Sequence, residues 1–288
     1  MFRISLILVF ISCLVIQESF AAPVWKVTKA NRTVYIGGTV HILRENDFPL
    51  PNAFEIAYQQ SDELVFETDI SVFGSPEFQQ LTMQYMLRKD GKTLSDILSK
   101  ETYQALEKHL QARSLDIQNF ATFTPGFITI SLSLMELRML GATSEGVDAF
   151  YEQKARHDSK SISWLEEPEQ QLLFLSQIGK GNEDEVISHT LSDIGSLPDY
   201  MTDMMEAWRS GDRNALRKIG IESLQQDYPK VYQRLIVDRN EDWLPNIEAL
   251  FDDAETEFVL VGTLHLIGED GVLTHLANKG YLVEALEN

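Results

Sequence analysis

Two segments at opposite ends of the chain carry the same pattern of residues that can bind a metal ion or move a proton. One reads VYIGGTVHIL at residues 34–43, and the other reads FVLVGTLHLI at residues 258–267. Each is an apolar run followed by Gly-Thr-x-His, which ends in His41 in the first copy and His265 in the second. Two imidazoles and a carboxylate make a site for a divalent metal with open positions, and such a metal activates water for hydrolysis.

The elements around each motif predict where the two histidines lie. Residues 24–28 and 33–36 read as two short strands of a hairpin, followed by a helix over about 52–60 and a strand over 63–67. Near the C-terminus the order repeats, with a strand over 257–262, a helix over 271–279 and a strand over 281–286. Parallel sheets carry functional groups at the carboxyl ends of their strands. We therefore expect both histidines at one sheet edge.

Other residues of these units belong to the same predicted edge. Glu67 ends the second strand of the first unit, and Glu166 ends a further strand over 162–166. Glycine allows a sharp turn and close approach of a ligand, and threonine can bond to the turn backbone. The motif residues of these types are Gly38, Thr39, Gly262 and Thr263. The alternative is a worn duplication in which the histidines only cap loops and Glu67 is solvated.

The middle of the chain is predicted to be mostly helical. Helices are expected over 76–88, 100–113 and 125–141, then a helix–strand–helix segment over 146–175, then four amphipathic runs from 182 to 251. The helix over 125–141 is apolar on almost every side, so we expect it to be buried or to contact a partner. No linker interrupts the chain. We predict one α/β domain over 22–288, in which two βαβ-type units contribute to a central mixed sheet and residues from about 76 to 250 form a helical insertion.

Composition and missing motifs exclude several classes of function. Lys and Arg total 24 against 44 Asp and Glu, and the net charge of −20 repels nucleic acid. Residues 1–21 are predicted to be a secretory signal peptide cut after Ala21, and they contain the only cysteine, Cys13. The mature chain is then expected to be periplasmic or secreted, with no disulfide, no thiolate nucleophile and no stable membrane insertion. Nucleophile-elbow, phosphate-loop and H-E-x-x-H motifs do not occur.

A larger set of short motifs resembles the TraB/GumN family, which includes the Tiki-type, metalloprotease-like proteins. The motifs are the two G-T-x-H segments, LVFETD, GVD, WLEEPEQQ, DRN and the final GTLHLIGEDGVLTHLANKGYLV. They extend over essentially the whole chain after residue 21. The resemblance implies a fold similar to that of the erythromycin-esterase and ChaN-like proteins, which is a two-part α/β sheet with a cleft between the halves.

The matched positions suggest roles for individual residues. His41 and His265 would bind a divalent transition metal (Mn, Co or Zn), and Glu67 would be either the third ligand or the general base. Arg239 and Asn240 would bind a substrate carbonyl or stabilise an oxyanion, or would only pack as a pair within a helix. Asp148 would support the site or only cap its helix. The positions expected to bind substrate or support the site are Gly38, Thr39, Gly262, Thr263, Asp148, Glu166, Gln170, Gly268 and Gly271, with Glu167 standing where many relatives have Thr.

These patterns together predict a secreted or periplasmic metal-dependent hydrolase that is peptidase-like and acts on a peptide or small-molecule substrate. One alternative is a non-catalytic envelope protein that binds haem, a metal or another ligand. Another is a catalytically silent scaffold in envelope assembly. The carboxylate beside the paired histidines favours a metal over haem, because haem iron usually takes His, Met, Cys or Tyr.

Overall fold

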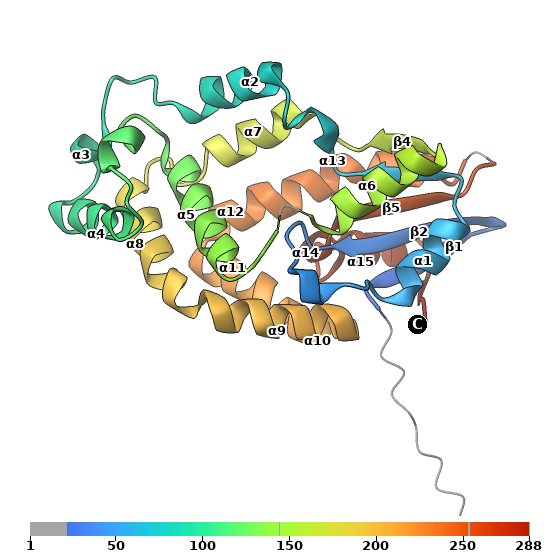
Figure 1. The fold of residues 1–288 in the computed structure, drawn as a ribbon. Coiled ribbons are helices and arrows are strands. Elements are labelled where there is room, and N and C mark those ends of the chain that lie inside the picture. Colours follow the sequence, from blue (N-terminus) through green and yellow to red (C-terminus); the bar gives the residue numbers. More distant parts are fainter. Residues whose placement is uncertain (1–21, 144, 253, 288) are drawn as a thin grey trace, which may run out of the picture.

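A six-stranded mixed sheet organises the chain in the computed structural model, which describes residues 22–143, 145–252 and 254–287 (Figure 1). The predicted signal peptide, residues 1–21, lies outside the described ranges. Within them the strand order is β4-β3-β5-β2-β1-β6. The strands are β1 Val24–Lys29, β2 Arg32–Thr39, β3 Glu63–Phe66, β4 Ser161–Trp164, β5 Glu257–Gly262 and β6 Leu282–Ala285.

Helices make up most of the remaining chain, and within the described ranges none is long and apolar enough to cross a membrane. Two π-helical segments, Arg217–Glu222 and Gln233–Val237, join α10 to α11 and α12 to α13. The α-helices are α1 Asn52–Gln59, α2 Pro76–Met86, α3 Leu94–Ile97, α4 Lys100–Gln111, α5 Pro125–Met139, α6 Val147–Asp158, α7 Pro168–Ser176, α8 Glu183–Asp193, α9 Leu197–Ser210, α10 Arg213–Leu216, α11 Ser223–Asp227, α12 Pro229–Tyr232, α13 Asp238–Ala249, α14 Thr263–Leu266 and α15 Val272–Asn278.

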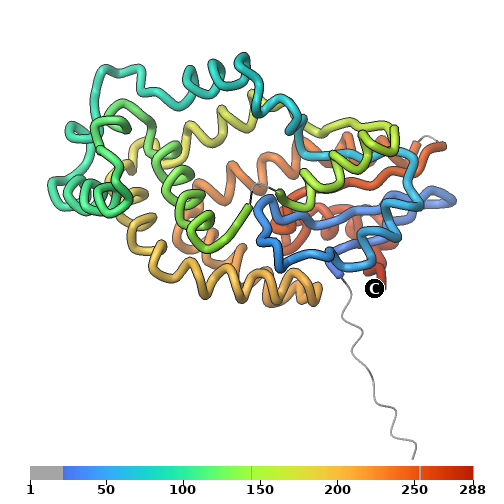
Figure 2. The backbone as a smooth tube through the Cα atoms, viewed as in Figure 1, coloured from blue at the N-terminus to red at the C-terminus, as the bar shows by residue number. Residues whose placement is uncertain are grey.

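The two motif strands are neighbours in the sheet. β2 pairs with β5 in parallel, and Thr39 lies opposite Gly262 in the register. β3 and β4 continue the parallel part beyond β5, whereas β1 runs antiparallel between β2 and β6. Figure 2 shows the N-terminal strands, in blue, beside the C-terminal ones, in red. The α/β class and the mixed sheet predicted from the sequence are therefore confirmed, and both motifs end at the same sheet edge.

The connections after β2 and β5 run in opposite directions. The β2–α1–β3 unit crosses over β5, whereas the β5–α15–β6 unit crosses over β2 and β1. Because such crossovers are right-handed, their helices belong on opposite faces of the sheet, and Figure 1 shows α1 in front of the sheet and α15 behind it. The two loops therefore diverge. A crevice at the carboxyl ends of β2 and β5 is the usual place for a ligand in such a sheet.

The helical middle region has a small core of its own. Leu106, Leu132 and Ile187 belong to a buried cluster formed around α4, α5 and α8, separate from the main cluster over the sheet. β4 interrupts the predicted insertion and pairs with β3, so this region also contributes a strand to the sheet. Helix α5 is buried only on one face. On its other sides Leu134 lines a cavity and Met139 is 68% exposed, so the burial expected from the sequence holds for only part of the helix.

Candidate functional site

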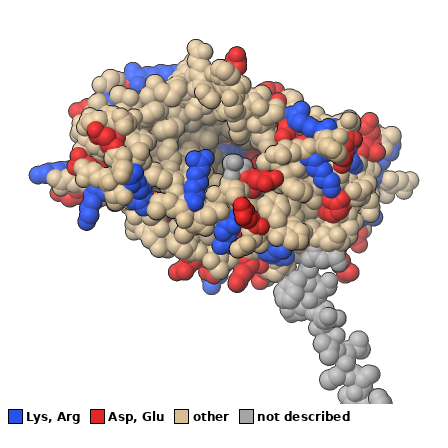
Figure 3. Space-filling model, viewed as in Figure 1, with Lys and Arg blue, Asp and Glu red and all other residues tan. Residues whose placement is uncertain are grey.

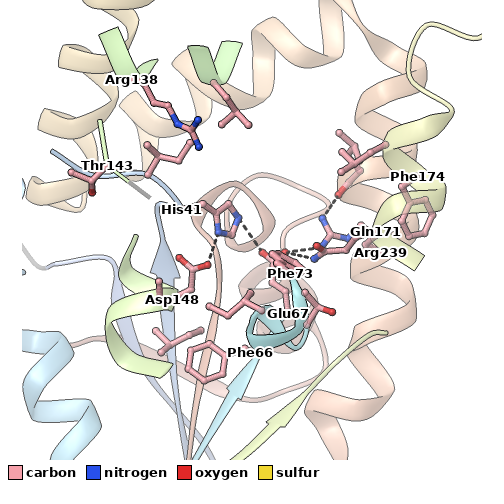
Figure 4. Close-up of a pocket in the computed structure, with 18 residues that line it drawn as sticks. His41, Phe66, Glu67, Phe73, Arg138, Thr143, Asp148, Gln171, Phe174 and Arg239 are labelled. Carbon is pink, nitrogen blue, oxygen red and sulfur yellow. Dashed lines mark hydrogen bonds and ion pairs between the residues drawn. The ribbon is translucent and has the colours of Figure 1, made fainter. Parts of the chain in front are cut away.

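A cavity of about 690 Å³ lies between the motif edge of the sheet and the helical region. Figure 3 shows it as a hollow in this face of the molecule, surrounded mainly by uncharged residues. Its walls are mostly apolar, and polar groups gather at its base, where Figure 4 shows His41 between Asp148 and Glu67. Apolar residues of the wall include Phe66, Phe73, Leu134, Phe174 and Leu235.

His41 faces this cavity from the loop after β2. Its side chain is 55% exposed, its Nδ1 lies 3.1 Å from Oδ2 of Asp148, and its Nε2 lies 3.9 Å from Oε1 of Glu67. Desolvation opposes the imidazolium and the nearby Arg239 also disfavours it. The two carboxylates, Asp148 above all, outweigh both effects and raise the pKa of His41 to about 9. Asp148 therefore holds the ring through Nδ1 and leaves Nε2 toward the cavity.

Close backbone packing of the GVD segment, residues 146–148, on the loop after β2 places Asp148 beside His41. A Cβ on Gly146 would lie only 2.3 Å from the carbonyl oxygen of His41, so no larger residue fits without displacing the loop. The backbone N–H of Val147 donates to the carbonyl of Val40 at 3.0 Å. Gly146 is the N-cap of α6, and Asp148 in the first turn makes no capping bond. Contact with His41, rather than the capping alternative, accounts for Asp148.

Glu67 is buried and ionised beneath His41. One oxygen accepts from the backbone N–H of Gly262 at 2.6 Å, and the other accepts from Arg239 Nη2 at 2.6 Å and from Gln171 Nε2 at 3.4 Å. Burial alone would raise the pKa of this carboxyl. Arg239, followed by His41 and the Gly262 N–H, instead holds it well below its usual range. With both oxygens bound, Glu67 is poorly placed to take a proton from water.

Arg239 joins the two glutamates that leave neighbouring strands. The backbone N–H of Glu166 donates to the carbonyl of Glu67 at 2.9 Å, so the two side chains emerge together. Arg239 Nη2 then donates to Glu166 Oε1 at 2.6 Å and Nε donates to Oε2 at 3.1 Å. Trp243, one turn along α13, also donates its indole N–H to Glu166, at 3.0 Å. A π-helical segment directly before α13, at residues 233–237, is a feature often found at functional sites.

His265 is enclosed by the same network. It is buried, its ring lies 4.5 Å from that of Trp243, and its Nδ1 lies 2.7 Å from Oδ1 of Asn240. Arg239 Nη1 lies 3.1 Å from Nε2. Because guanidinium only donates, Nε2 must accept and Nδ1 must carry the proton. Burial first, and then the charge of Arg239, lower the pKa of His265 to about 3. The two histidines are therefore not equivalent: one is exposed and basic, and the other is buried and neutral.

The motif glycines and the hydroxyl of Thr263 hold the two loops close together. A Cβ on Gly38 would lie 2.7 Å from the hydroxyl of Thr263, which donates to the carbonyl of Thr39 at 3.0 Å. A Cβ on Gly262 would lie 3.1 Å from Glu67 Oε1 and 3.5 Å from both His41 Nε2 and His265 Cδ2. All three predicted metal ligands therefore converge around the Cα of Gly262.

Their convergence does not produce a set of donors that fits a metal ion. Among the residues described, no group of three or more His, Cys, Asp or Glu side chains is placed to hold one. The guanidinium of Arg239 contacts Nε2 of His265 and Oε2 of Glu67, so two of the donor atoms are already engaged. The predicted metal site therefore stays a prediction.

Several predicted residues lie away from the cavity. Asn240 is fully buried behind His265, and its amide N–H groups donate to the carbonyls of His265 and Asp270, so it positions the histidine rather than meeting substrate. Gln170 accepts from the backbone N–H of Glu167 in the cap of α7. Gly268 and Gly271 shape the loop before α15.

Sequence reasoning missed three residues near the site: Gln171, Trp243 and Arg138. Gln171 contacts Glu67. The sequence signal for it was the capping box at the start of α7, because Gln170 is used in that cap and the next side chain points toward the site. Trp243 follows Arg239 by four residues, a spacing that places both on one helix face. Arg138 lines the cavity from the last turn of α5, and no motif marks it.

Comparisons with known proteins agree over nearly the whole chain. The model of the TraB/PrgY/gumN family matches residues 23–285. The "Uncharacterized protein YbaP" of Escherichia coli is 26% identical over 243 residues, which cover 83% of this chain and 86% of that protein. The "Metalloprotease TIKI2" of Xenopus tropicalis is 23% identical over 320 residues, covering 93% of this chain but only 60% of its own length. No solved structure matches.

Proposed function

We propose that this chain, which belongs to the TraB/PrgY/gumN family, is a hydrolase that cleaves peptide-like substrates bound in the cavity above His41. The similarity to a protein named a metalloprotease supports hydrolysis as the reaction class. Residues 1–21 support secretion or a periplasmic location, which remains part of the proposal. Haem binding by both histidines gains no support, because both ring nitrogens of His265 already have partners.

One observation carries this proposal. An exposed imidazole stands at the base of an apolar cavity, with a carboxylate on its Nδ1 and its Nε2 free of a close hydrogen-bond partner among the described residues. The neutral form of His41 can then take a proton from water as the water oxygen attacks the substrate carbonyl carbon. The resulting imidazolium returns that proton to the leaving amine as the C–N bond breaks. Asp148 stabilises the imidazolium, and Arg239 holds Glu67 in place.

Turnover against pH tests this assignment. His41 loses its proton near pH 9, so the rate on quenched fluorescent peptides rich in apolar residues should rise about tenfold per pH unit below that value and then level off. Asp148→Asn removes the main group that raises the pKa, while Glu67 and Arg239 still face the ring. The variant should level off at a lower pH and at a lower maximal rate. A rate that falls between pH 7 and pH 9 would instead identify the imidazolium as the active form.

Metal content tests the remaining part of the sequence prediction. After incubation with Mn²⁺, Co²⁺ or Zn²⁺ and desalting, the wild type should retain well under one equivalent, because Arg239 covers His265 and Glu67. Arg239→Met keeps an unbranched side chain but frees these donor atoms, and it should retain more metal than the wild type. About one equivalent in the wild type, lost on His265→Ala, would show that Arg239 withdraws and that the site is a metal centre after all.

A further inference from the structure

The cavity is also lined by a charged group whose role the reaction above does not explain. Arg138 lines the cavity from α5, and Figure 4 shows its guanidinium pointing into the space above His41, away from Glu67 and Arg239. Arg138 and Leu134 also line a shallower depression on α5. Arg138 therefore stands at the mouth of the cavity, where an entering ligand passes.

Arg138 differs from the other charged groups of the cavity in lacking a counterion. His41 pairs with Asp148, and Arg239 pairs with Glu67 and Glu166. Among the described residues, no carboxylate lies within ion-pair distance of the Arg138 guanidinium, although the chain carries 44 Asp and Glu against 24 Lys and Arg. Arg138 is an exposed arginine at the rim of a mostly apolar cavity, so its guanidinium is open to an entering ligand, and a carboxylate matches its two-pronged donor geometry.

Most of the cavity wall that Arg138 shares is apolar. Leu134, Phe174 and Leu235 are among its residues. A ligand that contacts this wall and Arg138 together must therefore carry an apolar body beside its anionic group. Phe174 and Leu235 also line a second depression of about 420 Å³, so a longer ligand can continue there beyond the site. That second depression carries charges of both signs, including Lys180 and Glu185, and suits the polar remainder of a peptide.

We infer that Arg138 binds the C-terminal carboxylate of an apolar peptide substrate, an inference that rests on the proposed function. The peptide's last apolar side chains occupy the cavity, its terminal carboxylate meets Arg138 at the mouth, and its N-terminal part continues past Phe174 toward the second depression. Arg138 thus selects substrates by their chain end and takes no part in proton transfer. The enzyme would prefer free peptide ends over the same sequence inside a longer chain.

Binding of a small probe tests the inference without any turnover. Fluorescence titration with N-dansyl-leucine and with its uncharged amide compares a carboxylate with a neutral group on the same apolar body. The acid should bind the wild type about fivefold to tenfold more tightly than the amide, as expected for a partly exposed charge-assisted pair. Arg138→Gln should remove this difference while leaving amide binding unchanged, and Arg138→Lys should keep part of it. Arg32→Gln, an exposed arginine at the far end of β2, is the matched control.

The results that would overturn the inference are distinct from those that would overturn hydrolysis. Equal binding of acid and amide to the wild type, equal loss of both in Arg138→Gln, or no saturation by either probe up to about 1 mM would each refute it. A further contrary result is a C-terminally amidated peptide with an acidic side chain that binds the wild type more tightly than Arg138→Gln by the same factor as the free acid does. That result would show that Arg138 binds acidic side chains and not the chain end. Peptide turnover without any effect of Arg138→Gln on KM refutes only the inference. Selective binding without turnover of any peptide refutes only the hydrolase.

Discussion

Replacing Arg239 with glutamine is expected to lower the free energy of unfolding by about 3 to 5 kcal/mol, the usual cost of removing one partner from a buried ion pair. The guanidinium is the shared partner of Glu67 and Glu166, all three side chains are at least nine-tenths buried, and it also contacts His265. Without it, two buried carboxylates face each other with no cation between them. Urea denaturation of the two proteins measures the difference.

The loss of unfolding free energy in Arg239→Gln should also become smaller as the pH falls. In the wild type Arg239 holds the pKa of Glu67 below its usual range, so this carboxylate contributes stability at neutral pH that is lost on acidification. In Arg239→Gln, burial without the guanidinium raises the pKa of Glu67. This carboxylate is therefore protonated as the pH falls, and the cost of burying its unpaired charge disappears. The difference between the proteins should therefore narrow from about pH 8 to about pH 5.

Two further variants make this expectation decisive. Arg239→Gln combined with Glu166→Gln removes one of the stranded charges and should cost less than the sum of the single changes. Arg217→Gln breaks a more exposed pair, with Glu222, and should cost no more than about 1 kcal/mol. A loss of under about 1 kcal/mol for Arg239→Gln at both pH values would mean that the guanidinium is not the support of this site.

The sequence predicted the placement of the motifs better than their chemistry. The apolar run before each Gly-Thr-x-His indicated a strand, and adjacent strand ends followed from the matched contexts of the two motifs. The two copies looked equivalent because the motif residues are the same. The two copies differ in the segment that follows the strand. After β5 the chain enters α14, and His265 is buried. After β2 the chain continues as a loop, and His41 is exposed.

The ion-pair network could not be predicted for a related reason. Glu67, Glu166 and Arg239 come from β3, β4 and α13, and their contacts depend on how α13 packs behind the sheet. The DRN segment marked Arg239 and Asn240 as a pair, yet on a helix consecutive residues point in different directions. Arg239 reaches the cavity between the two glutamates, whereas Asn240 bonds to His265 on the side away from the cavity. Sequence spacing gives the identity of such residues but not the partner of each.

The opposite environments of the histidines lead to the largest expected effect on activity. His41→Gln should lower kcat by about a hundredfold to ten-thousandfold, the range in which a positioned acid–base group contributes. KM should change little, because the apolar wall that binds substrate is intact. The free energy of unfolding should fall by about 1 to 2 kcal/mol, because His41 pairs with Asp148 but its side chain is half exposed and screened by solvent. Peptide turnover and urea denaturation of the same preparations measure these quantities.

His265→Gln should have a larger effect on the free energy of unfolding and a smaller direct effect on the chemical step than His41→Gln. The two variants together therefore separate a catalytic role from a structural one. It breaks the contacts with Asn240 and Arg239 in a buried site, and it should therefore destabilise the fold more than His41→Gln does. His157→Gln is the control for both, because that histidine is 88% exposed and pairs with Asp158. If His41→Gln keeps a third or more of the wild-type kcat while His265→Gln, still folded, loses it, the reacting group is the buried histidine. The Asp148 contact would then serve only to hold the loop after β2 against α6.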